Sequence, residues 1–149
     1  MMNLANVSIE DLLPQRPPMV MLDRLMHCEG MVAGGELLIR EGNVFTREGS
    51  FTESGMLEAL AQTAAARTSL VQRSQAGAEN RPPQVGVIGS IKDFRLHFLP
   101  KTGETIETEI ELLHEFLNAS VIRGRVLVAG AEACSAELKI FLTEDHQSS

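Results

Sequence analysis

A single long helical segment places the strongest constraint on the fold of this chain. Residues 55–76 are rich in alanine and contain no proline. Ser54 precedes them as a potential N-cap, and Gly77 follows them as a potential C-terminal stop. A helix of this length would extend roughly 33 Å. The sequence offers no second helix of similar length, so we expect this one to pack against a sheet.

The segments before this helix predict a short helix, two strands and a loop. Ser8 is a potential N-cap, and Pro14 ends the short helix that follows it. Residues 17–26 begin with two prolines and continue as a near-continuous apolar run, which predicts a strand. Residues 31–40 predict a second strand with a bend at its central glycines, and the polar residues 41–54 predict a loop.

The segments after the helix predict four further strands, at residues 85–98, 104–113, 119–128 and 134–142. In the second of these, glutamates alternate with Ile106, Thr108, Ile110 and Leu112, so one face is acidic and the other faces the interior. The third strand has arginines on its outer face, at positions 123 and 125. Facing rows of opposite charge predict that these two strands are antiparallel neighbours.

These elements together predict an α+β fold in which a curved antiparallel sheet wraps around one long helix. The helix contains many alanines, and such small side chains let a sheet approach closely. These are Ala59, Ala61, Ala64, Ala65 and Ala66. The edge strands of such a sheet need protection, and pairing with a second copy is the usual means.

Composition limits the classes of function. The length of 149 residues fits one domain, and a net charge of −7 without Trp or Tyr argues against nucleic-acid binding. The sequence shows no signal peptide and no apolar run long enough to cross a membrane, so we expect a cytoplasmic protein. Cys28 and Cys134 are far apart in sequence and predict reduced, buried thiols. No metal or other cofactor is implied.

Three blocks of this sequence resemble one enzyme family. "LLPQRPPMVMLDRL" is similar to the opening motif of the bacterial beta-hydroxyacyl-acyl-carrier-protein dehydratases. "GMLEALAQTAAA" resembles their central-helix motif, and "IKDFRLHFLPKTGETIETEIELL" resembles their third block, in which a turn links two long strands. The similarity extends from about Leu12 to Leu142. Among these proteins, the dehydratase-like members that accompany aryl polyene and flexirubin synthesis are the nearest variety.

The resemblance implies a fold, a substrate class and a partner. It implies a single hotdog domain over residues 1–149, with its core at about 12–142. The substrate would be a beta-hydroxyacyl thioester on acyl carrier protein or coenzyme A, in fatty-acid or polyene synthesis. The chain would form a homodimer, with an acyl tunnel at the subunit interface.

The resemblance also implies site residues. Glu58 would be the catalytic acid, and Gln62, one helical turn further on, would support Glu58 or the substrate. Backbone N–H groups at Gly55, Met56 and Leu57 would polarise the thioester carbonyl. Burial would raise the pKa of Glu58 and the helix dipole would lower it, and the sequence does not decide between these effects.

One departure from the family affects the expected reaction. Ser50 stands where the family has its catalytic His, and Ser cannot act as a base without one of its own. Ser50 is therefore retained only as a substrate-contact candidate. His97 and His114 lie in predicted strands, where a His is usually structural or at the surface, and a replacement base is the less favoured alternative for each. Two alternatives remain open: a hotdog acyl thioesterase that uses Glu58, and a non-catalytic acyl-binding subunit that pairs with a His-bearing paralogue.

Three arginines in and after the long helix have two interpretations. Arg67, Arg73 and Arg81 would be ordinary solvated side chains of a surface helix. The alternative is a docking patch for a phosphopantetheine arm or a carrier protein.

Overall fold

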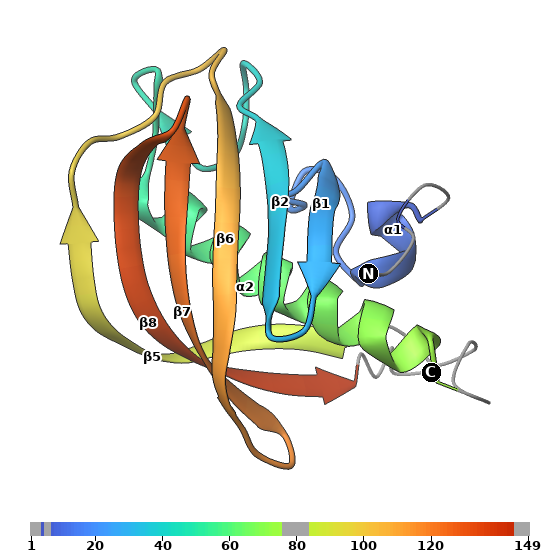
Figure 1. Ribbon diagram of the computed structural model, residues 1–149. Coiled ribbons are helices and arrows are strands. Elements are labelled where there is room, and N and C mark those ends of the chain that lie inside the picture. Colours follow the sequence, from blue (N-terminus) through green and yellow to red (C-terminus); the bar gives the residue numbers. More distant parts are fainter. Residues whose placement is uncertain (1–3, 5–6, 76–83, 145–149) are drawn as a thin grey trace.

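The computed structural model describes residues 4, 7–75 and 84–144, and its elements are shown in Figure 1. Two helices are present in these residues, α1 (Ile9–Leu12) and α2 (Glu53–Arg73). The strands are β1 (Arg24–Glu29), β2 (Val32–Leu38), β3 (Thr46–Arg47), β4 (Ser50–Phe51), β5 (Gln84–Leu96), β6 (Thr105–Glu115), β7 (Ala119–Val128) and β8 (Ala131–Glu144). None of the helices in the described residues is long and apolar enough to cross a bilayer.

The main sheet has six antiparallel strands in the order β1-β2-β6-β7-β8-β5. It curves around α2, which runs across the concave side of the strands (Figure 1). This is the predicted arrangement of a long helix wrapped by an antiparallel sheet, the hotdog fold.

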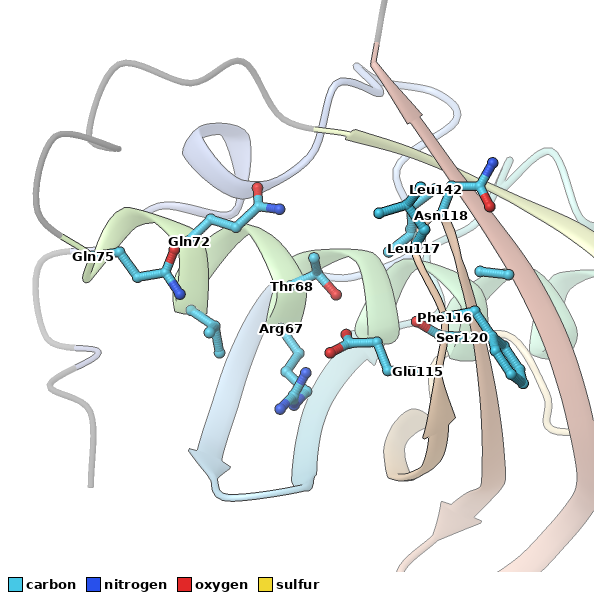
Figure 2. A pocket seen from close by; sticks show the side chains of 12 residues that line it. Arg67, Thr68, Gln72, Gln75, Glu115, Phe116, Leu117, Asn118, Ser120 and Leu142 are labelled. Atoms are coloured by element: carbon cyan, nitrogen blue, oxygen red, sulfur yellow. The ribbon is translucent and has the colours of Figure 1, made fainter.

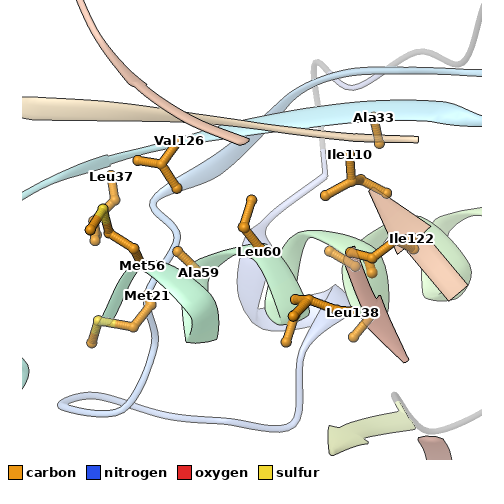
Figure 3. Close-up of a cluster of buried hydrophobic side chains, with 14 of the residues drawn as sticks. Met21, Ala33, Leu37, Met56, Ala59, Leu60, Ile110, Ile122, Val126 and Leu138 are labelled. Carbon is orange, nitrogen blue, oxygen red and sulfur yellow. The ribbon is translucent and has the colours of Figure 1, made fainter. Parts of the chain in front are cut away.

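The core lies between α2 and the sheet. Leu60 of α2 is fully buried and lies among Ile110, Ile122 and Leu138 from three strands (Figure 3). Gly124 of β7 permits close contact, because a Cβ atom at this position would lie 3.0 Å from Cδ2 of Leu60. The alanines predicted to face the sheet are all buried.

A chain of buried hydroxyl groups joins the middle of α2 to the sheet. The Thr63 hydroxyl donates to the carbonyl oxygen of Ala59 at 2.8 Å and lies 2.7 Å from the Thr108 hydroxyl. The Thr108 oxygen in turn accepts the N–H of Gly35 at 3.0 Å. Each hydroxyl is thus hydrogen-bonded, as buried polar groups require.

The long helix starts earlier than the sequence predicted. Its N-cap is Thr52, not Ser54, and the hydroxyl oxygen of Thr52 accepts the N–H of Gly55 at 3.3 Å. The same hydroxyl donates to the carbonyl oxygen of Phe45 at 2.8 Å, which holds the cap against the preceding hairpin. This contact depends on the hairpin that precedes the helix, and the cap pattern alone does not show it. The helix ends at Arg73, and the predicted stop at Gly77 lies outside the described residues.

Two predictions for the N-terminal third were wrong in detail. The strand expected at residues 17–26 begins only at Arg24, because the N–H of Met21 donates to the side chain of Gln62 instead of to a neighbouring strand. The loop expected at 41–54 contains the short β3–β4 hairpin and the first two residues of α2. The helix after Ser8 is confirmed, since the Ser8 hydroxyl oxygen accepts the N–H of Glu10.

The strands after α2 agree closely with their predictions. β6 and β7 are antiparallel neighbours, with Glu109 opposite Arg125 and their side chains 2.6 Å apart. Alternate residues of β8 were expected to face inward, and all of them are buried: Cys134, Ala136, Leu138, Ile140 and Leu142. β8 continues to Glu144, past the boundary expected at residue 142, because residues up to Glu144 pair with β5.

Candidate active site

Glu58 lies in the second turn of α2 and is half-buried. Its Oε1 atom accepts a hydrogen bond from Nε2 of Gln62 at 3.0 Å. The two residues are four apart on the helix, so their side chains share one face. The structure therefore brings together the two side chains that the sequence predicted as a pair.

Gln62 is the more strongly fixed member of this pair. It is only 1% exposed, and its Oε1 atom accepts the N–H of Met21 at 2.7 Å. Its Nε2 group also donates to the carbonyl oxygen of Met19 at 3.0 Å. Because these contacts fix the orientation of the amide, its second N–H points at Glu58 as a preformed donor.

The environment of Glu58 favours its neutral form. Burial raises the pKa of this carboxyl above its ordinary value of 4.5, and the hydrogen bond from Gln62 opposes that rise without cancelling it. A carboxyl with a raised pKa keeps its proton closer to neutral pH and can donate it to a leaving group. Burial therefore affects the pKa of Glu58 more than the hydrogen bond from Gln62 does.

The N–H groups at the start of α2 are already engaged. The N–H of Gly55 donates to the Thr52 hydroxyl, and that of Met56 donates to the carbonyl oxygen of Thr52 at 3.0 Å. Gly55 and Met56 are buried, while Leu57 is half-buried. The role expected for these N–H groups in polarising a thioester would require them to share their present hydrogen bonds, because the helix starts two residues earlier than predicted.

Ser50 lies in the β3–β4 hairpin that leads into α2. It pairs with Arg47 across the hairpin and with Lys101 in an isolated bridge, and its side chain is half-buried. Its backbone is thus fixed by two segments, yet among the described residues its hydroxyl makes no hydrogen bond to Glu58.

The histidines considered as a replacement base have other surroundings. His97 is exposed and its Nε2 atom lies 2.9 Å from Oε2 of Glu132. His114 is exposed near the end of β6. Neither imidazole is hydrogen-bonded to Glu58 in the part of the chain that the structure describes. In the same residues, no three His, Cys, Asp or Glu side chains are grouped as metal ligands would be.

Sequence reasoning missed two features of this region. The backbone of Met19 and Met21 contacts Gln62 across more than forty residues of sequence, and no local pattern indicates such a contact. Arg67 was expected to be solvated, but it is buried, whereas Arg73 is partly exposed and lies 3.9 Å from Asp11. Arg81 lies outside the described residues.

Comparison with known proteins shows the family to which this chain belongs. The model of a family described as ApeP-like, ApeP dehydratase, matches residues 7–149. The 3-hydroxyacyl-[acyl-carrier-protein] dehydratase FabZ of Latilactobacillus sakei is 26% identical over 151 residues, which cover 93% of this chain and 99% of that protein.

Solved structures share the fold at low sequence identity. The dehydratase heterocomplex ApeI:P from Xenorhabdus doucetiae matches with a TM-score of 0.77 and 12% identity, covering 95% of this chain and 94% of the other. A hypothetical thioesterase from Streptococcus pneumoniae, solved with coenzyme A, matches with a TM-score of 0.60 and 11% identity over 81% and 85% of the two chains. At such identities these likenesses concern the fold alone.

Proposed function

The chain belongs to the ApeP-like family of dehydratases, and from this premise we propose that it takes part in the dehydration of beta-hydroxyacyl thioesters, with Glu58 as the acid. The observation that supports the proposal most directly is the half-buried Glu58 carboxyl, held by Gln62 and raised in pKa. A carrier-bound substrate is part of the proposal, since the relative from Latilactobacillus sakei is described as a 3-hydroxyacyl-[acyl-carrier-protein] dehydratase.

The reaction needs an acid and a base. A base removes the proton from the carbon next to the thioester carbonyl, and the electron pair of that C–H bond forms the new C=C bond. The C–O bond at the beta carbon breaks as Glu58 protonates the departing hydroxyl, which leaves as water. Glu58 ends as the carboxylate, and it must regain a proton before the next turnover.

We place the missing base on a second chain. Ser50 stands where the resembling dehydratases have their catalytic His, and no described histidine is hydrogen-bonded to Glu58. A His-bearing paralogue that pairs with this chain would complete the site. The Xenorhabdus doucetiae structure is described as a heterocomplex, which supports this form of partnership.

The edge strand β5 is the proposed surface for this partner. β5 is the last strand of the sheet order, and among the described strands it pairs with β8 alone, so its other edge offers N–H and C=O groups to a further strand. Residues 91–98 are all exposed. They include large apolar side chains that a partner would cover: Ile91, Phe94, Leu96 and Phe98.

Intact mass spectrometry of a beta-hydroxyacyl carrier protein tests the proposal. The substrate is incubated with this chain alone, with a His-bearing dehydratase subunit alone, and with both. We expect loss of one water only when both are present. Loss of water with this chain alone would contradict the shared site, and loss of the acyl group would identify the alternative, a thioesterase. An unchanged substrate mass in every mixture would contradict the dehydration and favour the alternative of a non-catalytic acyl-binding subunit.

Glu58→Gln tests the assignment of the acid in the active mixture. The amide keeps the hydrogen-bonding shape of the carboxyl but has no proton to give, so the rate should fall by about a hundredfold or more. Glu53→Gln is the matched control, because Glu53 is an exposed carboxylate in the first turn of the same helix. Equal rates for the two variants would contradict the assignment of Glu58 as the catalytic acid.

A further inference from the structure

A cavity lies away from Glu58, between the C-terminal half of α2 and the β6–β7 hairpin (Figure 2). Its volume is about 400 Å³, which is within the range of small-molecule sites. One wall contains Arg67, Thr68 and Gln72 of α2, and the other contains Glu115 and the hairpin tip.

Arg67 is the unusual residue of this cavity. It is 9% exposed, and its Nη2 atom donates to the carbonyl oxygen of Gly30 at 3.0 Å. Its Nε atom is buried and has no hydrogen-bond partner in the part of the chain that the structure describes. Among the described residues, no carboxylate lies within ion-pair distance of its guanidinium.

The nearby thiol does not supply the missing negative charge. Burial raises the pKa of Cys28, and the attraction of the Arg67 charge only partly opposes that rise. Cys28 is therefore a neutral thiol at neutral pH. An arginine remains charged under all ordinary conditions, so it cannot avoid the cost of burial by losing its proton. A buried guanidinium that no described residue compensates favours the binding of an anion from outside the chain.

This cavity is separate from the candidate active site. Arg67 follows Glu58 by nine residues, which is about two and a half turns and roughly 13.5 Å along the helix axis. The two side chains therefore leave opposite faces of α2. Occupation of one site does not require occupation of the other.

We propose that this cavity binds the carboxylate of a small organic acid with an apolar or aromatic body. The guanidinium edge matches a carboxylate through paired N–H donors. Polar groups of Gln72 and Asn118 flank the site, and Val71, Phe116 and Leu142 supply apolar surface for the body of the ligand.

Glu115 favours a carboxylate over a phosphate. Its side chain is turned toward the wall that holds Arg67 and Thr68 (Figure 2). Arg67 and Glu115 are the two charged residues that line the cavity, so their charges sum to zero. A monoanion therefore meets less repulsion than a phosphate dianion. The carboxylate of Glu115 would also compete with the ligand's carboxylate for the guanidinium of Arg67.

Isothermal titration calorimetry with the purified full-length chain tests the proposal. The probes are sodium benzoate, its neutral isostere benzamide, and inorganic phosphate. We expect benzoate to bind at least about tenfold more tightly than benzamide, since only benzoate can form the charge-assisted pair. We expect phosphate to bind more weakly than benzoate. Equal binding of benzoate and benzamide, or no benzoate binding, would overturn the proposal, and preference for phosphate would overturn the choice of carboxylate.

Variants locate the site. Arg67→Gln should weaken benzoate binding by at least about tenfold, whereas Glu115→Gln should strengthen it by removing the competing charge. Glu58→Gln should leave the affinity unchanged, because Glu58 lies on the other face of the helix. If Arg67→Gln fails to fold, Arg67→Lys keeps the charge without the paired donors and should still weaken binding.

An NMR titration separates this site from the active site. Benzoate should shift the Nε–H resonance of Arg67 and the amide resonances of residues 116–118. Shifts confined to the surroundings of Glu58 would show that benzoate occupies the candidate active site instead. That outcome would overturn the second site and leave the proposed dehydration unaffected.

Discussion

Two opposite faces of α2 each hold one ionisable residue in poorly solvated surroundings, and the two differ in how their charge is compensated. Glu58 can be neutralised by a proton, and a fixed amide donates to it. Arg67 cannot be neutralised, and within the described residues its side chain donates one hydrogen bond, to a neutral carbonyl group. The comparison indicates that a buried acid can be stable and reactive within one chain, whereas a buried arginine remains incomplete without an anion.

Removing the amide that supports Glu58 should have the largest effect on stability. Gln62→Leu would leave the N–H of Met21 and the carbonyl of Met19 without their partners, and we expect the free energy of unfolding to fall by about 3 kcal/mol. Urea unfolding measures this change. Gln75→Leu is the control, because Gln75 is exposed. A loss no greater than that of the control would show that the 19–21 segment is held by other contacts.

Removing the charge of Arg67 should raise the free energy of unfolding, whereas removing the Gln62 amide should lower it. Arg67→Met keeps most of the side-chain volume and abolishes an uncompensated buried charge, so we expect the free energy of unfolding to rise by about 1 kcal/mol. The Gly30 carbonyl that loses its partner belongs to an exposed residue and can be hydrated. Thermal unfolding of this variant and of the more exposed Arg73→Met provides the measurement. A clear loss of stability would mean that Arg67 is compensated within the protein.

The contribution of Glu58 to folding stability should depend on pH, whereas that of Arg67, which stays charged, should not. The pKa of Glu58 is higher in the folded than in the unfolded chain, so the folded state binds the proton more tightly. Its contribution to stability is therefore fully present at low pH and declines as the pH rises from about 4.5 to the folded-state pKa. Relative to the wild type, Glu58→Gln should gain stability over this range. A flat difference between about pH 4 and pH 8 would contradict the raised pKa.

An exposed ion pair provides a reference for the stability effects expected at Glu58 and Arg67. Arg125 lies 2.6 Å from Glu109 on the outer face of the sheet. Both side chains are well solvated, so Arg125→Ala should lower the free energy of unfolding by no more than about 0.5 kcal/mol. Chemical unfolding at low and high salt checks this value. A larger, salt-sensitive loss would indicate that the surface charges act as a network with Arg123 and Glu137.

Much of the fold could be predicted because it depends on local patterns. The alternation in residues 104–113 and the opposing charges at Glu109 and Arg125 identified two neighbouring strands and their orientation. The spacing of Glu58 and Gln62 identified a pair on one helical face. These inferences succeeded because periods of two and of about 3.6 residues are imposed by the backbone itself.

The sequence by itself determined the long alanine-rich helix, the antiparallel pairing of β6 with β7 and the presence of a carboxyl beside an amide on that helix. Only the tertiary structure decided that Thr52 caps the helix, that Gln62 binds the 19–21 segment, and that Arg67 is buried. The last two depend on contacts between segments distant in sequence, and the cap depends on the hairpin that precedes the helix. Burial and hydrogen-bond partners belong to such contacts, and they determine whether a charged side chain is solvated, neutralised or left in need of a ligand.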